Sequence, residues 1–594
     1  MRRLHEIPYG AAAMAAGVRF RLWAPRADAV MLRLEGDERD LLLPMEREAH
    51  GFFSLTTAAA RPGTRYRYVI DSRDFPDPAS RRQPGGAFGP SEVVDPGAHE
   101  WRDAAWRGRK WEEIVLYELH IGAFSEAGDF DGVAHRLDHI AELGATAIEL
   151  MPVGEFAGRR NWGYDGVFLY APASCYGPPE ALKRLVEAAH RRGLAVLLDV
   201  VYNHFGPTGN AMAGVAPDFF RGQTPWGAAP DCTRRAVRDF IVENALYWLE
   251  EYHFDGLRLD AVDAIPDKGI PDIIDEIAAA AHARISGRPV HLILENDRNE
   301  TRYLMPRGGC RAQWNDDLYH ALHHLMTGER WSPCADFAEA PVRLLGRALS
   351  EGFAYQGEAS AHRGGRPRGE PSAGLPATSF VAFLQNHDQI GNHPAGARIA
   401  ALAPPALFAA GLATVLLAPQ IPLLFMGEEW ASASPFAFFC DFEPDLAAAV
   451  REARRRSFAR FPEWREASER LADPAAPETF AACRLDWDSR SCPGHARVLA
   501  LYHRLLAIRA REIVPRLAGV APGGRYRVLG PRAVRVEWRL ADASRLSLVA
   551  NFAADPAPLL EKEEGRLLFT SLAGPVPRGF APQGASFFLL EAAR

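Results

Sequence analysis

The chain has 594 residues, 48% of them hydrophobic and 24% charged, which is enough for several domains and a large buried core. A net charge of -7 at pH 7 provides no broad basic field and argues against a nucleic-acid partner. The seven cysteines follow no ligand or disulfide spacing, a pattern that favours reduced thiols in a cytoplasm.

The first hundred residues are expected to form a β-sandwich of an immunoglobulin-like or carbohydrate-binding type. Segments 18–25, 29–36 and 64–71 alternate apolar and polar residues between Gly, Pro and Asp, as half-buried strands do. No apolar stretch follows the two arginines near the N-terminus, so we expect no signal peptide. The Pro- and Gly-rich segment 81–99 then indicates a linker, which places the first domain over residues 1–100.

From about Trp101, short apolar segments alternate with amphipathic ones, which predicts a multidomain α/β protein. Eight strands with intervening helices are what a (β/α)8 TIM barrel requires, and we expect this barrel over residues 101–513. The alternation that follows predicts a C-terminal β-domain over residues 514–594. The expected barrel strands are 115–122, 147–153, 195–204, 256–262, 291–297, 312–318, 379–388 and 421–429.

The segment from Ile399 to Gly427 carries no charge and is mostly apolar. Because prolines interrupt it, a buried helix followed by a buried strand is a better interpretation than a membrane span. We therefore expect no membrane partner.

Polar side chains gather at the ends of several expected strands. Arg258 and Asp260 are two residues apart in the segment GLRLDAV, so they face the same side of a strand, opposite its leucines. Reacting groups of such barrels lie at the C-terminal ends of the strands. A single carboxylate there is commonly a turn or cap residue, whereas several after separate strands indicate a shared site. Further polar residues at strand ends are Asp199, Asn203, His204, Glu295, Asn386, His387 and Asp388.

Carboxyl groups that meet at one barrel mouth suit glycoside cleavage. This reaction uses one carboxylate as nucleophile or base, and one carboxylic acid to protonate the leaving oxygen. The neighbouring Arg258 stabilises a negative charge on Asp260, whereas the apolar strand before Glu295 favours a protonated carboxyl.

Four segments resemble the ordered signature regions of the alpha-amylase family. They are DVVYNH (199–204), GLRLDAV (256–262), LILEN (292–296) and FLQNHD (383–388), and they occur in the family's order. The resemblance extends over the whole chain, because an N-terminal sandwich and a C-terminal β-domain are common companions in this family. It implies a retaining mechanism with a covalent glycosyl–enzyme intermediate.

Position by position, the resemblance implies a role for each matching residue. Asp260 would be the nucleophile and Glu295 the general acid/base, while Asp388 would hold sugar hydroxyls and stabilise the transition state. Arg258 would pair with Asp260, and Asp199 would support that arginine by a hydrogen bond.

The resemblance also implies residues around the sugar in the cleavage subsite. His204 and His387 would hydrogen-bond this sugar, and Tyr164 would stack on it, with a buried core tyrosine as the rival interpretation. Asn203 would be a supporting residue. Many family members hold a structural calcium near this asparagine, but HFGPTGN follows it here, without the acidic ligands that calcium prefers. We expect no required metal and no cofactor.

Longer stretches resemble the family members that release trehalose by hydrolysing the α-1,4 bond next to a terminal trehalose of malto-oligosyltrehalose. That resemblance makes Asp263, Asn315, Asp316 and His320 candidate substrate contacts, although capping of loop ends explains each equally well. It also implies a partner synthase that makes the malto-oligosyltrehalose. The stretches are 149–167, 314–329, 379–392, 423–442, 450–461 and 477–487.

Several alternatives remain open at this stage. A glycogen branching enzyme shares the architecture and the catalytic trio, and the loops that select the acceptor decide between transfer and hydrolysis. Debranching enzymes come third, and a catalytically inactive glucan-binding protein is the alternative from another class. The segment 361–377 has arginines among Gly and Pro, which favours a solvated loop over a mobile lid.

Overall fold

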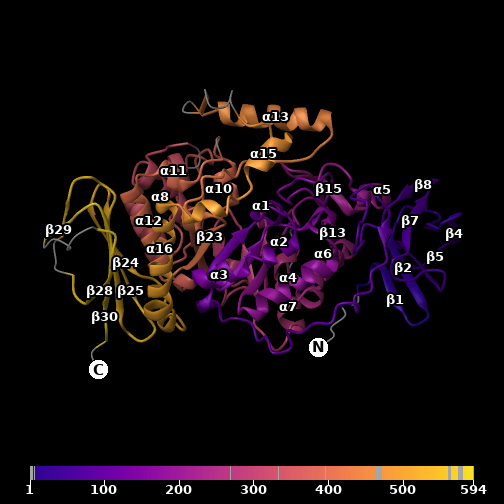
Figure 1. Ribbon diagram of the computed structural model, residues 1–594, viewed down its shortest axis with the longest axis horizontal. Coiled ribbons are helices and arrows are strands. Elements are labelled where there is room, and N and C mark those ends of the chain that lie inside the picture. Colours follow the sequence, from indigo (N-terminus) through magenta and orange to yellow (C-terminus); the bar gives the residue numbers. More distant parts are fainter. Residues whose placement is uncertain are drawn as a thin grey trace.

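The computed structural model describes residues 5–592 except 6, 268, 270, 332–333, 395, 462–463, 466–470, 560–562 and 573–578. Figure 1 shows a β-domain at the N-terminal end, a central domain of strands surrounded by helices, and a β-sheet at the C-terminal end. The fold class predicted from the sequence is confirmed, because the central strands close into a barrel.

The N-terminal domain contains two antiparallel sheets with a common core. One face of each sheet is buried because apolar and polar residues alternate along the strands, as in β2 (Gly17–Trp23) and β7 (Arg65–Ile70). Phe20 of β2 contacts Tyr66 of β7 with ring centroids 4.8 Å apart, which joins the two sheets. The sheets are β1-β2-β6-β5 and β4-β3-β7-β8, with β1 Gly10–Met14, β6 Phe52–Thr57, β5 Glu46–Arg47, β4 Leu41–Pro44, β3 Met31–Leu34 and β8 Arg73–Phe75.

The central domain is a closed barrel of eight parallel strands, one within each expected strand segment. Each strand is buried along its whole length, because helices cover the outside and side chains fill the inside. The strands are shorter than predicted, so most of the polar residues follow the strands. The strands are β10 Leu116–Leu119, β11 Ala147–Leu150, β14 Ala195–Val200, β17 Gly256–Leu259, β18 His291–Leu294, β19 Ala312–Trp314, β22 Phe380–Phe383 and β23 Ile421–Phe425.

The helices of the barrel follow the amphipathic segments of the sequence. The uncharged segment after residue 399 forms α12 (Pro405–Leu417) and then strand β23, which confirms the predicted buried helix and strand. None of the helices that the structure describes is long and apolar enough to cross a membrane. Other helices are α2 Phe130–Ala134, α3 Leu137–Leu143, α4 Pro179–Arg191, α6 Arg235–Glu251, α7 Ile273–Arg284, α8 Asp316–Thr327, α9 Pro341–Glu351 and α16 Pro493–Ile508.

Two further elements surround the barrel. Between β23 and α16 the chain forms an arm with α13 (Pro444–Ala459), which Figure 1 shows outside the body of the central domain. The C-terminal antiparallel sheet packs on α9, where the indole of Trp538 donates a hydrogen bond to the carbonyl of Leu349 at 2.9 Å. This sheet has the order β24-β25-β26-β30-β28, with β24 Arg525–Gly530, β25 Ala533–Arg539, β26 Arg545–Asn551, β30 Gly584–Leu590 and β28 Arg566–Thr570.

Candidate active site

The polar residues predicted at strand ends meet at the C-terminal mouth of the barrel. Asp199 of β14 and Arg258 of β17 are direct neighbours in the strand register. Asp260 follows β17 and Glu295 follows β18, each one residue beyond its short strand. Asp388 belongs to the short helix α10 (His387–Gly391), which follows β22.

Arg258 connects three carboxyl groups at the mouth. Its Nη1 donates to both oxygens of Asp199 at 2.9 and 2.8 Å and to Oδ1 of Asp260 at 2.7 Å, while Nη2 lies 2.7 Å from Oε2 of Glu295. The guanidinium carbon is 4.2 Å from the ring centroid of Trp314, and the residue is 1% exposed. The planar fork of an arginine suits this multiple pairing, which a lysine does not reproduce.

Both oxygens of Asp260 have a fixed donor. Arg258 binds Oδ1, and Nδ2 of Asn203 donates to Oδ2 at 2.7 Å and to the backbone carbonyl of Asp260 at 3.0 Å. The side chain of Asp260 is 12% exposed, so it is open to the mouth while its orientation is set from behind. These donors hold the carboxyl group of Asp260 in one orientation.

Glu295 shares the guanidinium of Arg258 with Asp260. Burial raises the pKa of Glu295, and the nearby Arg258 opposes part of this rise. Its side chain is 25% exposed, so the carboxyl is accessible from the mouth although the protein around it disfavours the charged form. Glu295 therefore keeps its proton to a higher pH than a solvent-exposed glutamic acid does.

The residue after Asp260 has an unusual backbone conformation. Ala261 adopts a φ of 36°, in the left-handed region that residues other than glycine rarely occupy. In this conformation its N–H donates to Oε2 of Glu295 at 3.0 Å. Strain of this kind persists where the surrounding structure enforces it, and here it connects the two carboxyl residues.

An aromatic and histidine cluster forms another wall of the mouth. The hydroxyl of Tyr164 donates to Oδ2 of Asp199 at 2.7 Å, and its ring stacks on His387 with centroids 5.0 Å apart. Nδ1 of His387 is 2.5 Å from Oε1 of Glu118, and its backbone N–H donates to Oε2 at 3.1 Å. Burial lowers the pKa of His387, but the Glu118 carboxylate more than reverses this, so the pKa is raised.

The pKa of His204 is shifted in the opposite direction from that of His387. Its Nδ1 is hydrogen-bonded to Oδ1 of Asn203, and this contact turns the asparagine Nδ2 toward Asp260. Burial lowers the pKa of His204, which favours the neutral imidazole at pH 7.

Two acidic residues that the sequence analysis did not predict lie within barrel strands. Glu118 of β10 and Glu149 of β11 are register partners, and both are 1% exposed. Neither carboxyl oxygen of Glu149 has a hydrogen-bond partner among the residues that the structure describes, and burial raises its pKa well above the usual range. The signal was present, since each is an acidic residue within an apolar strand.

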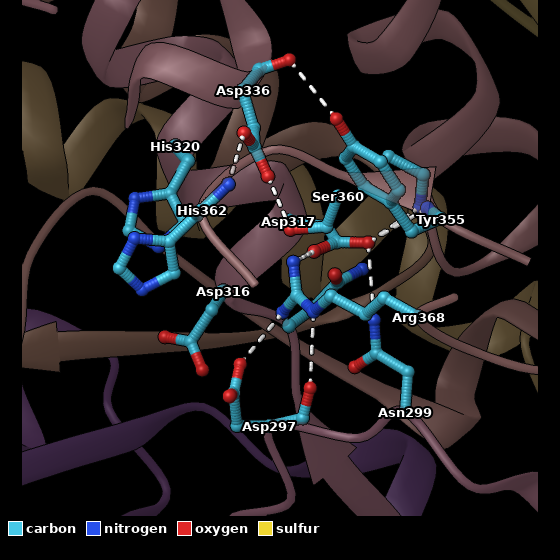
Figure 2. A network of polar contacts seen from close by, with 12 residues as sticks. Asp297, Asn299, Asp316, Asp317, His320, Asp336, Tyr355, Ser360, His362 and Arg368 are labelled. Carbon is cyan, nitrogen blue, oxygen red and sulfur yellow. Dashed lines mark hydrogen bonds and ion pairs between the residues drawn. The ribbon is translucent and has the colours of Figure 1, made fainter. Parts of the chain in front are cut away.

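The four outer substrate candidates divide into two pairs. Asp263 and Asp316 lie on the Glu295 side of the mouth, and burial raises the pKa of both, most strongly that of Asp316. Oδ1 of Asp316 accepts a hydrogen bond from Gln389 at 3.2 Å, and Figure 2 shows this carboxyl near Asp297.

The other pair, Asn315 and His320, is buried and contacts neighbouring groups of the protein, and its role in substrate binding stays a prediction. Asn315 is 0% exposed, since its Oδ1 caps α8 and its Nδ2 donates to the carbonyl of Gly352 at 2.8 Å. His320 is 4% exposed, and its Nδ1 is 3.4 Å from the sulfur of Cys334. Capping and packing therefore occupy these two side chains.

The segment 361–377 is neither a free loop nor a free lid, because a hairpin at its start is held by ion pairs. Strands β20 (Ala359–Ser360) and β21 (Arg366–Pro367) form this hairpin. Arg368 is 5% exposed and lies 2.6 Å from Oδ1 of Asp317 and 3.2 Å from Oδ1 of Asp297 (Figure 2). Most of residues 361–367 are exposed, as the composition predicted, while the contacts of Arg368 with distant loops hold the hairpin against the barrel.

A protein metal site needs several His, Cys, Asp or Glu side chains that converge on one point. Among the described residues, no group of three or more His, Cys, Asp or Glu side chains is arranged to hold a metal ion. The expectation that no metal is required stays a prediction.

Three family models match successive parts of the chain. Residues 8–96 match carbohydrate-binding module 48 (isoamylase N-terminal domain), and residues 101–217 match the alpha amylase catalytic domain. Residues 521–588 match a domain of unknown function, DUF3459.

Similar proteins cover most of the chain. It is 40% identical to malto-oligosyltrehalose trehalohydrolase of Deinococcus radiodurans, over 84% of this chain and 82% of that one. The protein of the same name from Saccharolobus solfataricus is also 40% identical, over 83% of this chain and 85% of that one. A 1,4-alpha-glucan branching enzyme of Vibrio parahaemolyticus is 33% identical over 42% of this chain and 36% of its own.

Solved structures agree with the fold. The crystal structure of a candidate alpha amylase from Salmonella typhimurium has a TM-score of 0.93 at 44% identity, covering 98% of this chain and 100% of that one. A pullulanase from Anoxybacillus with bound maltotetraose has a TM-score of 0.73 at 18% identity, over 98% of this chain and 87% of that one. The second similarity is one of fold alone.

Proposed function

The chain belongs to the malto-oligosyltrehalose trehalohydrolase family, a branch of the alpha-amylase glycoside hydrolases, and from this membership we propose its reaction. The protein hydrolyses the α-1,4-glucosidic bond next to the terminal trehalose of malto-oligosyltrehalose, releasing trehalose and a shortened maltodextrin. Support comes from the name shared by relatives that are 40% identical over more than four-fifths of the chain.

In the first step, a carboxylate oxygen of Asp260 attacks the anomeric carbon of the glucosyl unit that precedes the trehalose. Glu295 donates its proton to the departing glycosidic oxygen, the bond to trehalose breaks, and a covalent glycosyl ester forms. Glu295 becomes a carboxylate at this point. Arg258 and the N–H of Ala261, 2.7 and 3.0 Å from its Oε2, stabilise the new charge.

In the second step, water attacks the same carbon and gives a proton to Glu295. The ester bond breaks, Asp260 returns to a free carboxylate, and the maltodextrin leaves with retained configuration. The donors from Arg258 and Asn203 already point at the Asp260 oxygens, so the returning charge needs no rearrangement of the site. Retention predicts a separation of roughly 5–5.5 Å between the Asp260 and Glu295 carboxyl groups.

Other residues bind the sugar on which the reaction occurs. Asp388 accepts hydrogen bonds from its hydroxyls, and His387 offers a ring N–H. The Nδ1–H of His204 is bound to Asn203, so the Nε2 of this neutral ring accepts a hydrogen bond from a sugar hydroxyl. Tyr164, fixed by Asp199 and His387, presents an aromatic ring to the apolar side of the pyranose.

The observation that carries the mechanism is the contact of one buried arginine with Asp199, Asp260 and Glu295. The function itself is tested by incubating the protein with maltotriosyl-trehalose and, separately, with amylose. We expect free trehalose without new branch points. New α-1,6 linkages would instead assign a branching activity, and turnover of neither glucan would favour a glucan-binding protein.

Replacement of Asp260 by Asn tests the nucleophile. We expect turnover of maltotriosyl-trehalose to fall about 10⁴-fold or more, because a neutral amide does not form the ester. Thermal melting should change little, and Asp138→Asn, at an exposed surface ion pair with Arg192, is the control. Near-normal turnover of the Asp260 variant would remove this residue from the mechanism.

Several finer features complete the proposal. All seven cysteines are free thiols, which supports a reducing cytoplasm as the compartment. A synthase that makes malto-oligosyltrehalose supplies the substrate. The domain boundaries are proposed at residues 100/101 and 513/514, between the sandwich, the catalytic barrel and the C-terminal β-domain.

A further inference from the structure

The helix that carries Asp388 is held from outside the barrel. Helix α10 has 5 residues. Its last residue, Gly391, packs so closely against Trp162 that a Cβ atom would lie 2.0 Å from the indole ring. The arm helix α13 reaches the same, C-terminal end of α10, where Arg454 of α13 donates from Nη2 to the carbonyl of Gly391 at 2.7 Å. A residue of the arm thus caps the C-terminal end of α10.

A chain of two hydrogen bonds leads from the arm to Asp388. Nη1 of Arg454 donates to Oδ1 of Asn392 at 3.3 Å, and Nδ2 of Asn392 donates to Oδ1 of Asp388 at 2.6 Å. An arginine has donors only, so it binds the oxygen of the asparagine amide and turns the NH2 group away. In this orientation the amide offers a donor to the Asp388 carboxylate; the flipped amide would present an oxygen to it.

Arg454 differs from its neighbours on the helix. Arg455 and Arg456 are 58% and 73% exposed and both pair with Glu452. Among the residues that the structure describes, no carboxylate lies in ion-pair contact with Arg454, which is flanked by the rings of Phe438 and Phe458 at 4.7 and 5.2 Å. Burial lowers the pKa of Arg454 to about 10, which still leaves the guanidinium charged at pH 7.

We propose that Arg454 is a positioning residue for Asp388, acting through the side-chain amide of Asn392. The inference rests on the proposed function, in which the ionised Asp388 binds the sugar at the cleavage point. Arg454 fixes the amide, the amide fixes one oxygen of Asp388, and the capped helix fixes the backbone that carries both.

The charge of Arg454 acts in the same direction as the hydrogen bonds. Burial and the neighbouring Glu295 raise the pKa of Asp388. The positive charges of His387, Arg258 and Arg454 lower it. Without Arg454 the pKa of Asp388 rises, so its ionised form is lost at a higher pH as the solution is acidified. The titratable or charged groups that face Asp388 are His387, Arg258, Glu295, Asp316, Tyr319 and Arg454.

The first test compares Arg454→Gln with Arg455→Gln and Arg456→Gln, which remove the same charge from the same helix. For Arg454→Gln we expect kcat on maltotriosyl-trehalose to fall roughly 10- to 100-fold, with a smaller change in KM, because misplacement affects the transition state most. The acid limb of the pH–rate profile should move to higher pH. Arg454→Lys should keep the position of the acid limb and recover part of kcat.

The second test asks whether the effect passes through Asn392. Asn392→Ala removes the donor to Asp388, and the Arg454→Gln/Asn392→Ala double variant should lose less kcat than the product of the two single losses, because only the cap on α10 is left for Arg454 to supply. Additive losses would show that Arg454 acts by another route. A rise in KM with unchanged kcat would make Arg454 a substrate-binding residue and would also overturn the proposal.

A third measurement needs no substrate, so it separates this inference from the proposed reaction. The pH dependence of the melting temperature is compared between chains with Asp388 and chains with Asp388→Asn, and the difference reports the titration of Asp388. Arg454→Gln should move this titration to higher pH, and Arg455→Gln should not. Identical titrations in the two variants would overturn the proposal, whereas absence of trehalose release by the unmodified protein would contradict only the reaction.

Discussion

Arg258 and Arg454 both support carboxylates of the barrel mouth, but they do so in different ways. Arg258 is part of a barrel strand and touches Asp199, Asp260 and Glu295 directly. Arg454 comes from an arm outside the barrel and reaches Asp388 through Asn392. The carboxyl groups that we propose change their charge in the reaction are thus held by a barrel strand, whereas Asp388, which we propose binds the sugar, is held by a more distant element.

The largest expected difference concerns stability. Arg258→Ala leaves three neighbouring carboxyl groups without their shared cation, and we expect a loss of about 3–5 kcal/mol in the free energy of unfolding, with no measurable turnover. Arg454→Ala removes no ion-pair partner and should lose about 1 kcal/mol. Urea denaturation of both variants measures the difference in the free energy of unfolding. Equal losses would contradict the idea that only Arg258 neutralises buried carboxyl groups directly.

A third arginine, Arg368, lies on a loop, as Arg454 lies outside the barrel, but it pairs directly with carboxylates, as Arg258 does. It therefore separates the effect of direct pairing from that of position on a barrel strand. Arg368→Gln leaves the fully buried Asp317 without its cation, so we expect a loss of about 1–3 kcal/mol. Arg366→Gln, an exposed change in the same hairpin, is the matched control and should stay within about 0.5 kcal/mol. Urea denaturation and limited proteolysis of the hairpin distinguish the two; equal behaviour would mean that the ion pairs contribute nothing.

The smallest expected effect is on the alkaline limb of activity. Burial raises the pKa of Glu295, and activity falls as pH rises through that pKa because the acid loses its proton. Arg454 is among the main groups that shift the pKa of Asp388 and not among the main groups that shift that of Glu295, so Arg454→Gln should move the acid limb far more than the alkaline limb. The pH dependence of kcat/KM from both sides of the optimum measures this, and a joint shift of both limbs would show that the two sides of the mouth are coupled.

Much of the barrel and its inner site was predictable because strand geometry is regular. A side-chain period of two residues and the parallel arrangement place Asp199, Arg258, Asp260 and Glu295 at one mouth, and the structure brings them together. Glu118 also lies on a barrel strand, but within β10 and not after its end, so the rule that reacting groups follow strand ends does not select it.

The outer shell of the site was not predictable in the same way. Asn315 and His320 belong to a segment that resembles relatives, but the local geometry of α8 turns one into a cap and the other inward. Arg368 reaches Asp317 across loops that no sequence period relates. Arg454 is one of three consecutive arginines, and only the path of the arm decides which of them meets the barrel.

The arm also has a consequence for the order in which the site is completed during synthesis. All eight barrel strands have been made once Phe425 leaves the ribosome, but Arg454 follows later in the chain. At about 5–20 residues per second, the stretch from Phe425 to Arg454 takes roughly one to six seconds to synthesise. A nascent chain can therefore close its barrel while Asp388 still lacks its outer support, so the mature geometry of the mouth is among the last features to form.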